Sequence, residues 1–508
     1  MSKCWHILLL CLCLATTGCV TAPFDYPRES STAISPDADT ALKARVLGWQ
    51  AENEGPSGFY PLIRGSEGLG ARLKLIERAE KTIDAQYFLM KGDTAGKVFA
   101  GSLLAAADRG VRVRFLLDDV FTTVKDKGLE LIDAHPNIEV RLYNPISRVG
   151  LKGLNFLLDF RRANRRMHNK SFIADNQITI VGGRNIADEY FDLNSEGEFM
   201  DFDVIALGPI AADVSIEFDR YWNHERSLPI KAFKSKFTEQ DLQKARDEIS
   251  DEMNSLEQSV YREAIETELI TALVGGKQNL YSATAEVITD DPDKLVSRIS
   301  EENMILVQEL AKAVREAEEE VIAVTPYLVP GKDGIEFWRS ITAKGVRVLM
   351  VTNSLASNNH KAVHSGYAHY RKKLLNAGVE LYEARANAAD VASAGTSDAE
   401  TLTLHTKAML IDGKRLFVGS LNQDARSREI NSEMGLLIDS PEMGEQLSSR
   451  LLAALPELAY RVERDERGRL QWRGQIDGVE VIETKEPLTS WWLRFKAFLL
   501  KIAPERQL

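Results

Sequence analysis

The first half of the chain alternates between apolar positions at helical spacing and apolar positions at strand spacing. Helical spacing occurs over residues 69–79, and residues 82–89 then follow the pattern of a buried strand. The same criteria predict helices over 98–108 and 128–135 and strands over 111–119 and 138–144. Strands that alternate with helices favour an α/β fold in which helices cover both faces of a sheet.

The second half repeats this order of elements. It predicts helices over 304–317, 334–343 and 364–375, and strands over 321–327, 346–353 and 378–383. The phrases at 109–113 (RGVRV) and 344–348 (KGVRV) are close echoes of each other. We therefore expect two similar α/β/α sandwich lobes, 56–232 and 301–470, that face each other about a pseudo-twofold axis.

The remaining residues divide into four segments. Residues 1–18 are expected to be a signal peptide and 19–55 a tether, because Pro, Ser, Thr and Asp are frequent after residue 20. Residues 233–300 read as a mainly helical insertion, and the sequence leaves open whether it guards a site or only bridges the lobes. Residues 471–508 form a tail with an amphipathic helix.

One set of reactive residues occurs twice, 237 positions apart. Each copy reads His-x-Lys-x(4)-Asp, followed by a pair of small residues and an Asn. The first copy comprises His168, Lys170, Asp175, Gly183 and Asn185, and the second comprises His405, Lys407, Asp412, Ser420 and Asn422. A single copy would occur by chance in many strands, whereas two copies at one spacing indicate a functional site.

Strand geometry predicts how each copy is arranged. Alternation places the His and Lys of one copy on the same face, about 6–7 Å apart along the strand. The strand reverses at Asp175-Asn176 and at Asp412-Gly413, so we expect structural support from these Asp residues more than proton transfer. Backbone N–H groups at the small residues, with the adjacent Asn side chains, would suit an oxyanion if a helix begins there.

The motifs and the strings around them resemble the phospholipase D superfamily, and within it the bacterial cardiolipin synthase C type. The strings are NRRMHNKSF (164–172), VGGRNIADEYF (181–191), VHSGYAHYRKKLL (363–375), GVELYE (378–383) and NSEMG (431–435). The resemblance extends over roughly 60–477. It implies one active site to which both motifs contribute.

By this resemblance, one histidine attacks phosphorus to form a phosphohistidine and the other acts as general acid and base. We assign His168 as nucleophile and His405 as acid and base, although the order could be reversed. The lysines Lys170 and Lys407, with Asn185, Asn422, Gly183 and Ser420, would hold the phosphate oxygens. The acidic residues that orient the imidazoles in the family match Asp203 and Glu433 here. The resemblance implies no cofactor and no metal.

The resemblance further implies transfer of a phosphatidyl group to form cardiolipin. Phosphatidylglycerol would be one substrate and phosphatidylethanolamine the donor. Hydrolysis to phosphatidic acid uses the same motifs and stays open, as do a nuclease of the same superfamily and a catalytically silent phospholipid-binding lipoprotein. A net charge of −12 weighs against nucleic acid as a partner. The need for a helper protein is left open.

Other residues suggest competing roles. His360 and His364 stand at i, i+4 and could bind zinc, but no third ligand is near in sequence. Asp118-Asp119 could hold magnesium, although a turn after a strand explains the pair more simply. The cluster Arg161, Arg162, Arg165 and Arg166 precedes the first motif, where it would be either a solvated face or a headgroup-binding patch.

The two ends of the chain suggest a membrane. All four cysteines lie in the first 19 residues, and the apolar run 7–15 has the proportions of a secretory signal. The segment looks like a bacterial lipoprotein signal with lipidation at Cys19, although Thr16 departs from the pattern and an uncleaved anchor is the alternative. We expect a lipid-anchored protein of the bacterial envelope that faces the periplasm, with inner or outer membrane undecided.

The C-terminal residues form an apolar stripe on a helical wheel, flanked by basic residues. The stripe contains Trp491, Trp492, Phe495, Phe498, Leu499 and Ile502. Such a helix suits a membrane interface, but it could equally pack on its own protein.

Overall fold

The computed structural model describes residues 22–193, 197–233, 238–257, 280–388 and 401–500. The predicted signal peptide and Cys19 lie outside these residues. The first lobe contains α2 (Ala41–Glu52), β1 (Ser57–Leu62), α3 (Gly65–Arg78), β2 (Thr82–Tyr87), α4 (Thr94–Asp108), β3 (Arg112–Asp118), α5 (Asp126–Asp133), β4 (Ile138–Tyr143), α6 (Lys152–Leu158), α7 (Phe160–Ala163), β5 (Ser171–Ala174), β6 (Ile178–Gly182), β7 (Glu198–Met200), β8 (Asp203–Leu207), α8 (Pro209–Trp222) and β9 (Ser227–Pro229).

Helix α9 (Glu239–Glu257) follows, and then the second lobe. That lobe contains β10 (Tyr281–Thr289), α12 (Ile305–Arg315), β11 (Glu320–Val324), α13 (Gly331–Thr342), β12 (Arg347–Asn353), α14 (Lys361–Ala368), α15 (Arg371–Asn376), β13 (Val379–Ala384), β14 (Leu402–Leu404), β15 (Ala408–Ile411), β16 (Arg415–Gly419), α17 (Ala425–Glu429), β17 (Met434–Asp439), α18 (Pro441–Leu458), β18 (Ala459–Arg464), β19 (Leu470–Ile476), β20 (Val479–Glu483) and α19 (Trp491–Leu499). The single helix predicted over 364–375 is in fact two helices, α14 and α15.

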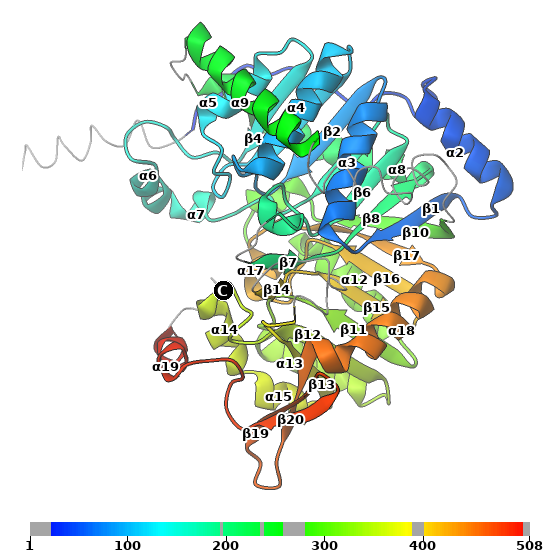
Figure 1. Cartoon of the computed structure of the whole chain (residues 1–508), viewed down its shortest axis with the longest axis vertical. Coiled ribbons are helices and arrows are strands. Elements are labelled where there is room, and N and C mark those ends of the chain that lie inside the picture. The colour runs from blue at the N-terminus through cyan, green and yellow to red at the C-terminus, as the bar shows by residue number, and fades with distance from the viewer. Residues whose placement is uncertain (1–21, 194–196, 234–237, 258–279, 389–400, 501–508) are drawn as a thin grey trace, which may run out of the picture.

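Among the described residues, most strands form one 18-stranded sheet that runs through both lobes (Figure 1). From the junction outward, the first lobe has the order β1-β8-β6-β5-β2-β3-β4-β9. The second has β10-β17-β16-β15-β11-β12-β13-β18, and β19 and β20 extend its edge. Because β1 pairs antiparallel with β10, corresponding strands lie at equal distances from one central axis. The predicted pseudo-twofold arrangement is confirmed.

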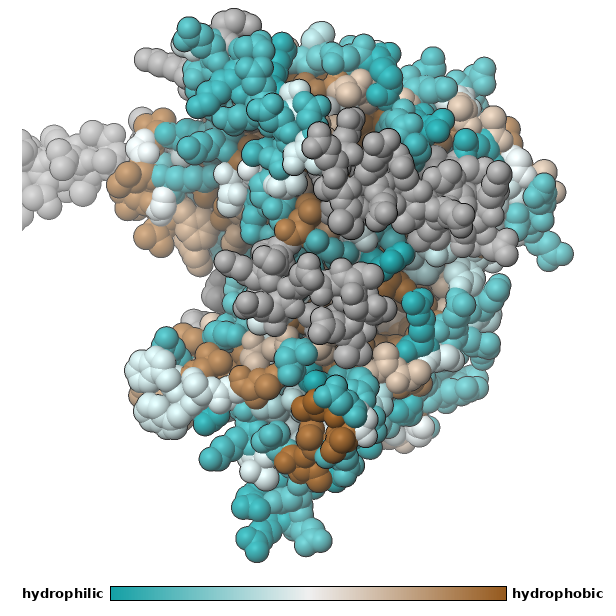
Figure 2. Space-filling model, in the orientation of Figure 1, coloured by the Kyte–Doolittle hydropathy of each residue, from teal (hydrophilic) through white to brown (hydrophobic). Residues whose placement is uncertain are grey.

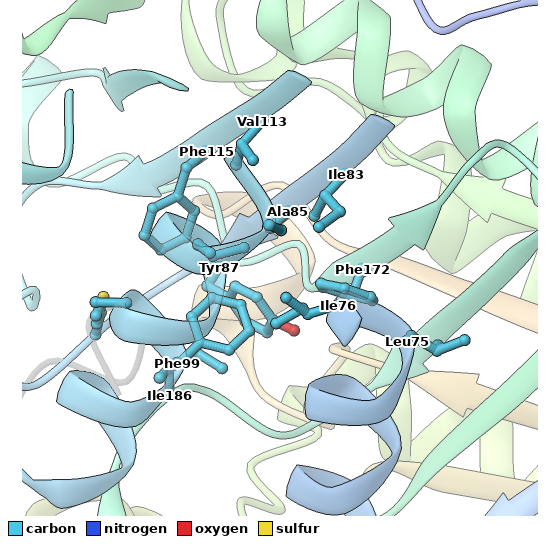
Figure 3. Close-up of a cluster of buried hydrophobic side chains, with 14 of the residues drawn as sticks. Leu75, Ile76, Ile83, Ala85, Tyr87, Phe99, Val113, Phe115, Phe172 and Ile186 are labelled. Atoms are coloured by element: carbon cyan, nitrogen blue, oxygen red, sulfur yellow. The ribbon is translucent and has the colours of Figure 1, made fainter. Parts of the chain in front are cut away.

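Helices cover both faces of the sheet, because alternate strand residues point to opposite faces. On one face of the first lobe, the helices α3 and α4 pack on Ile83, Ala85, Tyr87, Val113 and Phe115 (Figure 3). On the other face, α8 packs against Leu116 and Ile173 in a cluster that continues into Val418, Leu436 and α18 of the second lobe. The lobes therefore share a hydrophobic core as well as a sheet.

Two predicted boundaries in the second half of the chain are wrong. The second lobe begins at β10, not at residue 301, because β10 occupies the position that β1 has in the first lobe. The insertion is shorter than predicted, and its helix α9 packs on α4, where Lys97 pairs with Glu252 at 3.0 Å. The residues after 470 are not a separate tail, because β19 and β20 lengthen the sheet.

The predicted tether is also wrong for residues 22–55. Arg141 donates to the carbonyl of Glu29 at 2.6 Å, and Arg114 donates to that of Ser31 at 2.9 Å. Both guanidinium groups are almost fully buried and need acceptors, which this extended segment provides through its backbone. Helix α2 then buries Leu42 and Val46 against the first lobe.

In the part of the chain that the structure describes, no helix combines the length and the apolar character needed to cross a bilayer.

The docking of α2 can be tested with two leucines of the same helix. Leu42 is 1% exposed, whereas Leu47 is 53% exposed. We expect Leu42→Ala to lower the free energy of unfolding by about 2–5 kcal/mol, because it leaves a cavity. The matched control Leu47→Ala should stay within about 0.5 kcal/mol of the wild type. Denaturant unfolding measures both, and equal small effects would mean that α2 is not part of the folded unit.

Candidate active site

Each motif is carried by a β-hairpin with a tight turn. Asp175 and Asn176 in the β5–β6 turn have φ of 51° and 55°, and Asp412 and Gly413 in the β15–β16 turn have 54° and 60°. Positive φ at both central residues belongs to a type I′ turn, which matches the twist of the strands. The predicted hairpins are therefore confirmed.

The two turn aspartates support the sheet and do not contact the imidazoles. The Asp175 carboxylate accepts hydrogen bonds from the backbone N–H groups of residues 80–82, which lead into β2. Asp412 accepts the equivalent three from residues 318–320, before β11. In each motif a four-residue strand separates the aspartate from the histidine, because the histidine precedes the strand and the aspartate follows it. These contacts agree with the structural support expected for both aspartates and not with a direct catalytic role.

His168 is held by residues of the second lobe. Its backbone N–H donates to the carbonyl of Ser432 at 2.9 Å, and its Nδ1 lies 2.7 Å from Oε2 of Glu433. Ser420 donates its hydroxyl to the same carboxylate oxygen at 2.5 Å. The ring of Phe88 meets the imidazole edge-on at 4.7 Å between centroids. The predicted partner Glu433 thus contacts the histidine of the other motif.

His405 is held in the corresponding way by the first lobe. Strand β14, which ends just before His405, pairs in parallel with β7. The backbone N–H of His405 donates to the carbonyl of Met200 at 2.8 Å. Its Nδ1 lies 2.6 Å from Oδ2 of Asp201. Phe199 stacks on the imidazole at 5.1 Å, and Tyr190 meets it edge-on at 5.2 Å. Each imidazole therefore has an aromatic neighbour, and the carboxylate that contacts it comes from the opposite lobe.

The prediction that Asp203 orients a histidine is wrong, because Asp201 has that position. Asp203 accepts from Arg72 at 2.9 Å and from the backbone N–H of Arg184 at 3.2 Å. The sheet register explains the error. Gly182 pairs with Asp203 in the first lobe as Gly419 pairs with Gly435 in the second, so Asp203 corresponds to Gly435. Asp201 and Glu433 each lie two residues before these equivalent positions. Aligning the two apolar strands that follow, instead of seeking the nearest acidic residue, would have identified Asp201.

Both motif lysines are almost fully buried beside the histidines. Lys170 donates to the carbonyl of His168 at 2.6 Å and lies over the ring of Phe88. Lys407 donates to the carbonyl of His405, and its Nζ lies within 3.4 Å of both ring nitrogens of that histidine. The sequence correctly placed each ammonium on the side of its own imidazole.

The charged groups of the two halves influence one another's pKa values, as expected if both halves form one site. Burial, Lys170 and also Lys407 of the other lobe lower the pKa of His168 well below its usual range. Burial and Lys407 lower the pKa of His405 to about 3, with a smaller contribution from Lys170. Burial lowers the pKa of Lys170 to about 7 and that of Lys407 to about 8. An anion between the lysines would counter these shifts.

The two carboxylates differ in charge. Burial raises the pKa of Glu433 to about 7. Burial acts in the same direction on Asp201, but Lys407 and His405 outweigh it and lower the pKa of Asp201 to about 2. Asp201 is therefore a full anion at neutral pH, whereas Glu433 titrates there.

Of the four predicted phosphate-binding residues, only Asn422 has a free polar atom, and this atom accepts hydrogen bonds, so it suits a ligand hydroxyl and not a phosphate oxygen. The backbone N–H groups of Gly183 and Ser420 donate to carbonyls within the sheet. Asn185 accepts from the N–H of Leu89 at 3.2 Å and donates to the Tyr190 hydroxyl at 2.9 Å. The buried Oδ1 of Asn422 has no hydrogen-bond partner among the described residues. A glycine at 183 is required instead because a Cβ there would lie 2.1 Å from an Asp201 oxygen.

Asn422 also borders a cavity of about 680 Å³ in the second lobe. Its wall is formed by α12, α13 and the segment 421–429, with apolar side chains such as Leu310, Phe337 and Trp338. This cavity could not be predicted from the sequence, because its walls come from segments far apart in the chain.

Three of the four arginines before His168 donate hydrogen bonds within the protein and do not form a headgroup-binding patch. Arg162 donates to the side chain of Asn144 at 2.7 Å, and Arg165 donates to the carbonyl of Lys294 at 2.9 Å. Arg166 is fully buried and donates to Asp118 at 3.2 Å. Arg161 alone of these four is exposed.

The other candidate ligands have protein partners. Asp118 accepts from the N–H of Met167 at 3.0 Å, so it helps to position the first motif, and Asp119 pairs with Arg148 at 2.5 Å. His364 lies 3.0 Å from a nitrogen of Arg371.

Comparisons with known proteins agree with this geometry. The family described as "Cardiolipin synthase, PLD-like domain" matches residues 73–222 and 310–453, one segment in each lobe. Cardiolipin synthase C of Escherichia coli K12 is 37% identical over 474 residues, which cover 91% of this chain and 98% of the relative. An uncharacterized protein of Helicobacter pylori 26695 is 30% identical over 500 residues, 97% of each chain.

A solved structure supports the fold. The crystal structure of phosphatidylserine synthase from Haemophilus influenzae Rd KW20 superimposes with a TM-score of 0.54 at 14% identity, covering 82% of this chain and 92% of that one. At this identity the likeness concerns the fold alone. With the family match in both lobes and the paired motifs in one site, the chain belongs to the cardiolipin synthase family of the phospholipase D superfamily and is a phosphatidyltransferase.

Proposed function

We propose that this enzyme forms cardiolipin by transferring a phosphatidyl group from phosphatidylethanolamine to phosphatidylglycerol through a phosphohistidine. The observation that carries the proposal is the paired arrangement of two imidazoles and two buried lysines, each imidazole held by a carboxylate of the other lobe. The relative named cardiolipin synthase C supports the choice of product.

In the first half of the reaction, His168 acts as nucleophile. With Nδ1 directed to Glu433, its Nε2 attacks the phosphorus of the donor phospholipid. The bond from phosphorus to the ethanolamine oxygen breaks, and His405 gives that oxygen a proton from Nε2. The ammonium groups of Lys170 and Lys407 stabilise the charge that develops on the phosphate oxygens.

In the second half, His405 removes the proton from a glycerol hydroxyl of phosphatidylglycerol. The resulting oxygen attacks phosphorus, the bond to Nε2 of His168 breaks, and cardiolipin leaves. Both histidines then have their initial protonation, so the cycle closes without a further reactant.

The difference between the two carboxylates supports this assignment of roles. The full negative charge of Asp201 beside Nδ1 favours protonated His405, which a general acid requires. Near neutral pH Glu433 has less negative charge, which favours the neutral imidazole that a nucleophile requires. In the free site Lys407 opposes protonation of His405, and an anionic phosphodiester between the lysines would relieve this effect.

The aromatic rings around the histidines favour transfer to a lipid over hydrolysis. Phe88 covers one edge of His168, and Phe199 and Tyr190 cover two sides of His405. Apolar rings reduce the space for water next to the phosphohistidine, whereas a lipid hydroxyl would enter together with its own apolar chains.

We also propose that the protein is anchored in the bacterial envelope through lipid on Cys19 and faces the periplasm. The support is the sequence before Cys19 together with a phospholipid substrate. Mass spectrometry of the mature N-terminus decides this, and an unmodified Met1 or Cys19 would reject it.

The products test the reaction. Purified enzyme given phosphatidylglycerol and phosphatidylethanolamine should yield cardiolipin and ethanolamine in equal amounts. After a rapid alkaline quench, mass spectrometry should find the phosphatidyl adduct on the peptide that contains His168. His405→Ala should reduce turnover by about 10²–10⁴-fold. An adduct on His405 would reverse the two roles, and phosphatidic acid as the main product would favour hydrolysis.

The two neighbouring aspartates should respond differently to the same substitution. Asp201→Asn removes the charge beside His405, so turnover should fall by about 10²–10⁴-fold while the melting temperature changes little. Asp203→Asn leaves Arg72 and Arg184 without their buried anion, so stability should fall by about 3–5 kcal/mol. Thermal unfolding and steady-state rates measure both. A stable, inactive Asp203→Asn variant beside an active Asp201→Asn variant would contradict the assignment.

Anion binding should take up protons, because an anion restores the charge of lysines whose pKa values are about 7 and 8. Sulfate affinity should therefore fall between pH 6 and 9, by up to about tenfold per pH unit for each proton taken up. Calorimetry at pH 8 in buffers of different ionisation enthalpy measures the uptake. The number of protons taken up should be about one lower in Lys170→Met than in the wild type. Most of Lys170 is neutral at pH 8 and takes up a proton when the anion binds, and the methionine cannot do so.

The exposed Lys372 provides the control for this experiment. Lys372→Met should leave the uptake of the wild type unchanged. Sulfate binding without proton uptake at any pH in this range would contradict the arrangement.

A further inference from the structure

Helix α6 exposes its apolar side chains and buries a polar one. Leu151, Leu154, Leu157 and Leu158 are 52–74% exposed. Within this helix, which the structure describes in full, Asn155 is the one buried residue. Its amide donates to the carbonyls of Ser147 and Val149 at 3.0 and 2.6 Å, which fixes the helix in place. A fixed helix with an open apolar face is unfavourable in water and indicates a binding surface.

Helix α19 has the same property. Trp491, Trp492 and Phe498 are 53–67% exposed, and Trp491 and Phe495 stack on each other at 5.4 Å. The helix is attached to α14, where the hydroxyl of Ser365 donates to the carbonyl of Ala497 at 2.7 Å. Neither of the two expectations for this helix describes it fully, because it contacts its own protein and yet exposes its aromatic stripe.

The two helices project from the same side of the molecule, one from each lobe. Figure 1 shows α6 and α19 on the left, above and below the level of β7 and β14. Figure 2 shows hydrophobic residues gathered on this side over α6 and paler residues over α19. Strands β7 and β14 adjoin His405, so in this view the active site lies at a level between the two helices.

Each helix is also connected to one half of the site. The chain runs from α6 through α7 to His168, and Arg426 of the second lobe fixes Asn164 on this path with two hydrogen bonds of 2.9 Å. On the other side, α14 follows β12, whose last residue Asn353 exchanges two hydrogen bonds with Leu404, next to His405. Movement of either helix would therefore be resisted by contacts of the active site.

The charge around both helices is opposite to that of the whole protein. Most arginines of residues 148–166 pair within the protein, but Lys152 and Arg161 are exposed at α6 and Lys496 is exposed on α19, in a chain of net charge −12. Lys496 lies over the ring of Trp492. Basic residues beside exposed Trp, Phe and Leu suit the interface of a bilayer with anionic phospholipids.

We propose that α6 and α19 together form a membrane-docking face, which seats in the headgroup region of a bilayer that contains anionic phospholipid. The face holds the active site at the level of the phosphates, so that a substrate enters without leaving the bilayer completely. This inference rests on the proposed function, since it takes phospholipids as the substrates.

The test measures how the chain partitions onto vesicles. Every sample lacks residues 1–19, so that neither lipidation of Cys19 nor the apolar run 7–15 masks the effect. The wild-type face should bind vesicles of phosphatidylethanolamine and phosphatidylglycerol more tightly than vesicles of phosphatidylcholine, and about 0.5 M salt should weaken this binding. Two triple variants remove the apolar residues: Leu154→Ser, Leu157→Ser, Leu158→Ser in α6, and Trp491→Ser, Trp492→Ser, Phe498→Ser in α19. Each should weaken the binding by at least about tenfold.

The chain offers a matched control. Leu47, Ile216 and Val479 are 53–65% exposed but lie on α2, α8 and β20. The triple variant Leu47→Ser, Ile216→Ser, Val479→Ser should bind vesicles as the wild type does. Wild-type affinity in the α6 and α19 variants, or the same loss in the control, would overturn the proposal. A dimer in solution that the α6 and α19 variants dissociate, without a change in vesicle binding, would assign the face to a second copy instead.

Activity separates this inference from the proposed function. On monomeric short-chain phospholipids the α6 and α19 variants should turn over at the wild-type rate, while on vesicles they should lose activity in step with binding. If the wild type formed no cardiolipin from any lipid, the proposed function would fail, and the vesicle measurements would still decide whether the face docks. Equal loss on monomeric and vesicle lipids would overturn the docking role.

Discussion

The candidate active site depends on two carboxylate–imidazole pairs, each of which joins one lobe to the other. Glu433 of the second lobe contacts His168 of the first, and Asp201 of the first contacts His405 of the second. All four groups are buried, so each lobe alone would leave a carboxylate and a histidine without their partners. Buried charges without partners are costly. The pairing therefore ties the integrity of the site to the correct assembly of both lobes.

The rest of the fold stabilises the association of the two lobes. The lobes share one sheet through β1 and β10, and a hydrophobic core continues from α8 to α18. Backbone hydrogen bonds join Met200 to His405 and Ser432 to His168 at the site itself. Such a joint leaves little freedom for one half-site to move relative to the other. A rigid pair of half-sites suits phosphoryl transfer, in which nucleophile and leaving group must be in line.

The pseudo-twofold symmetry of the fold is broken in the chemistry. Asn185 is occupied by Leu89 and Tyr190, whereas Asn422 has an unpaired amide oxygen next to a cavity. Burial raises the pKa of Glu433 to about 7, so this carboxyl titrates near neutral pH, whereas Asp201 remains ionised. The proposed two-step transfer requires one histidine that attacks and one that moves protons. Two identical half-sites would not distinguish these roles. The asymmetry between the half-sites is therefore what would make one histidine the nucleophile and the other the general acid and base.

The sequence alone determined the repeated α/β order, the two hairpins and the positions of His168, Lys170, His405 and Lys407, because these follow from local periodicity and from turns that need positive φ. It also determined the family, through strings that surround the motifs. Only the tertiary structure decided that Asp201 and not Asp203 faces an imidazole, that residues 22–55 dock on the first lobe, and that Leu154 and Trp491 stay exposed on one side. These features depend on which distant segments meet across the sheet. The pattern of apolar and polar residues predicts that one face of an element is buried, but it does not specify which other element covers that face.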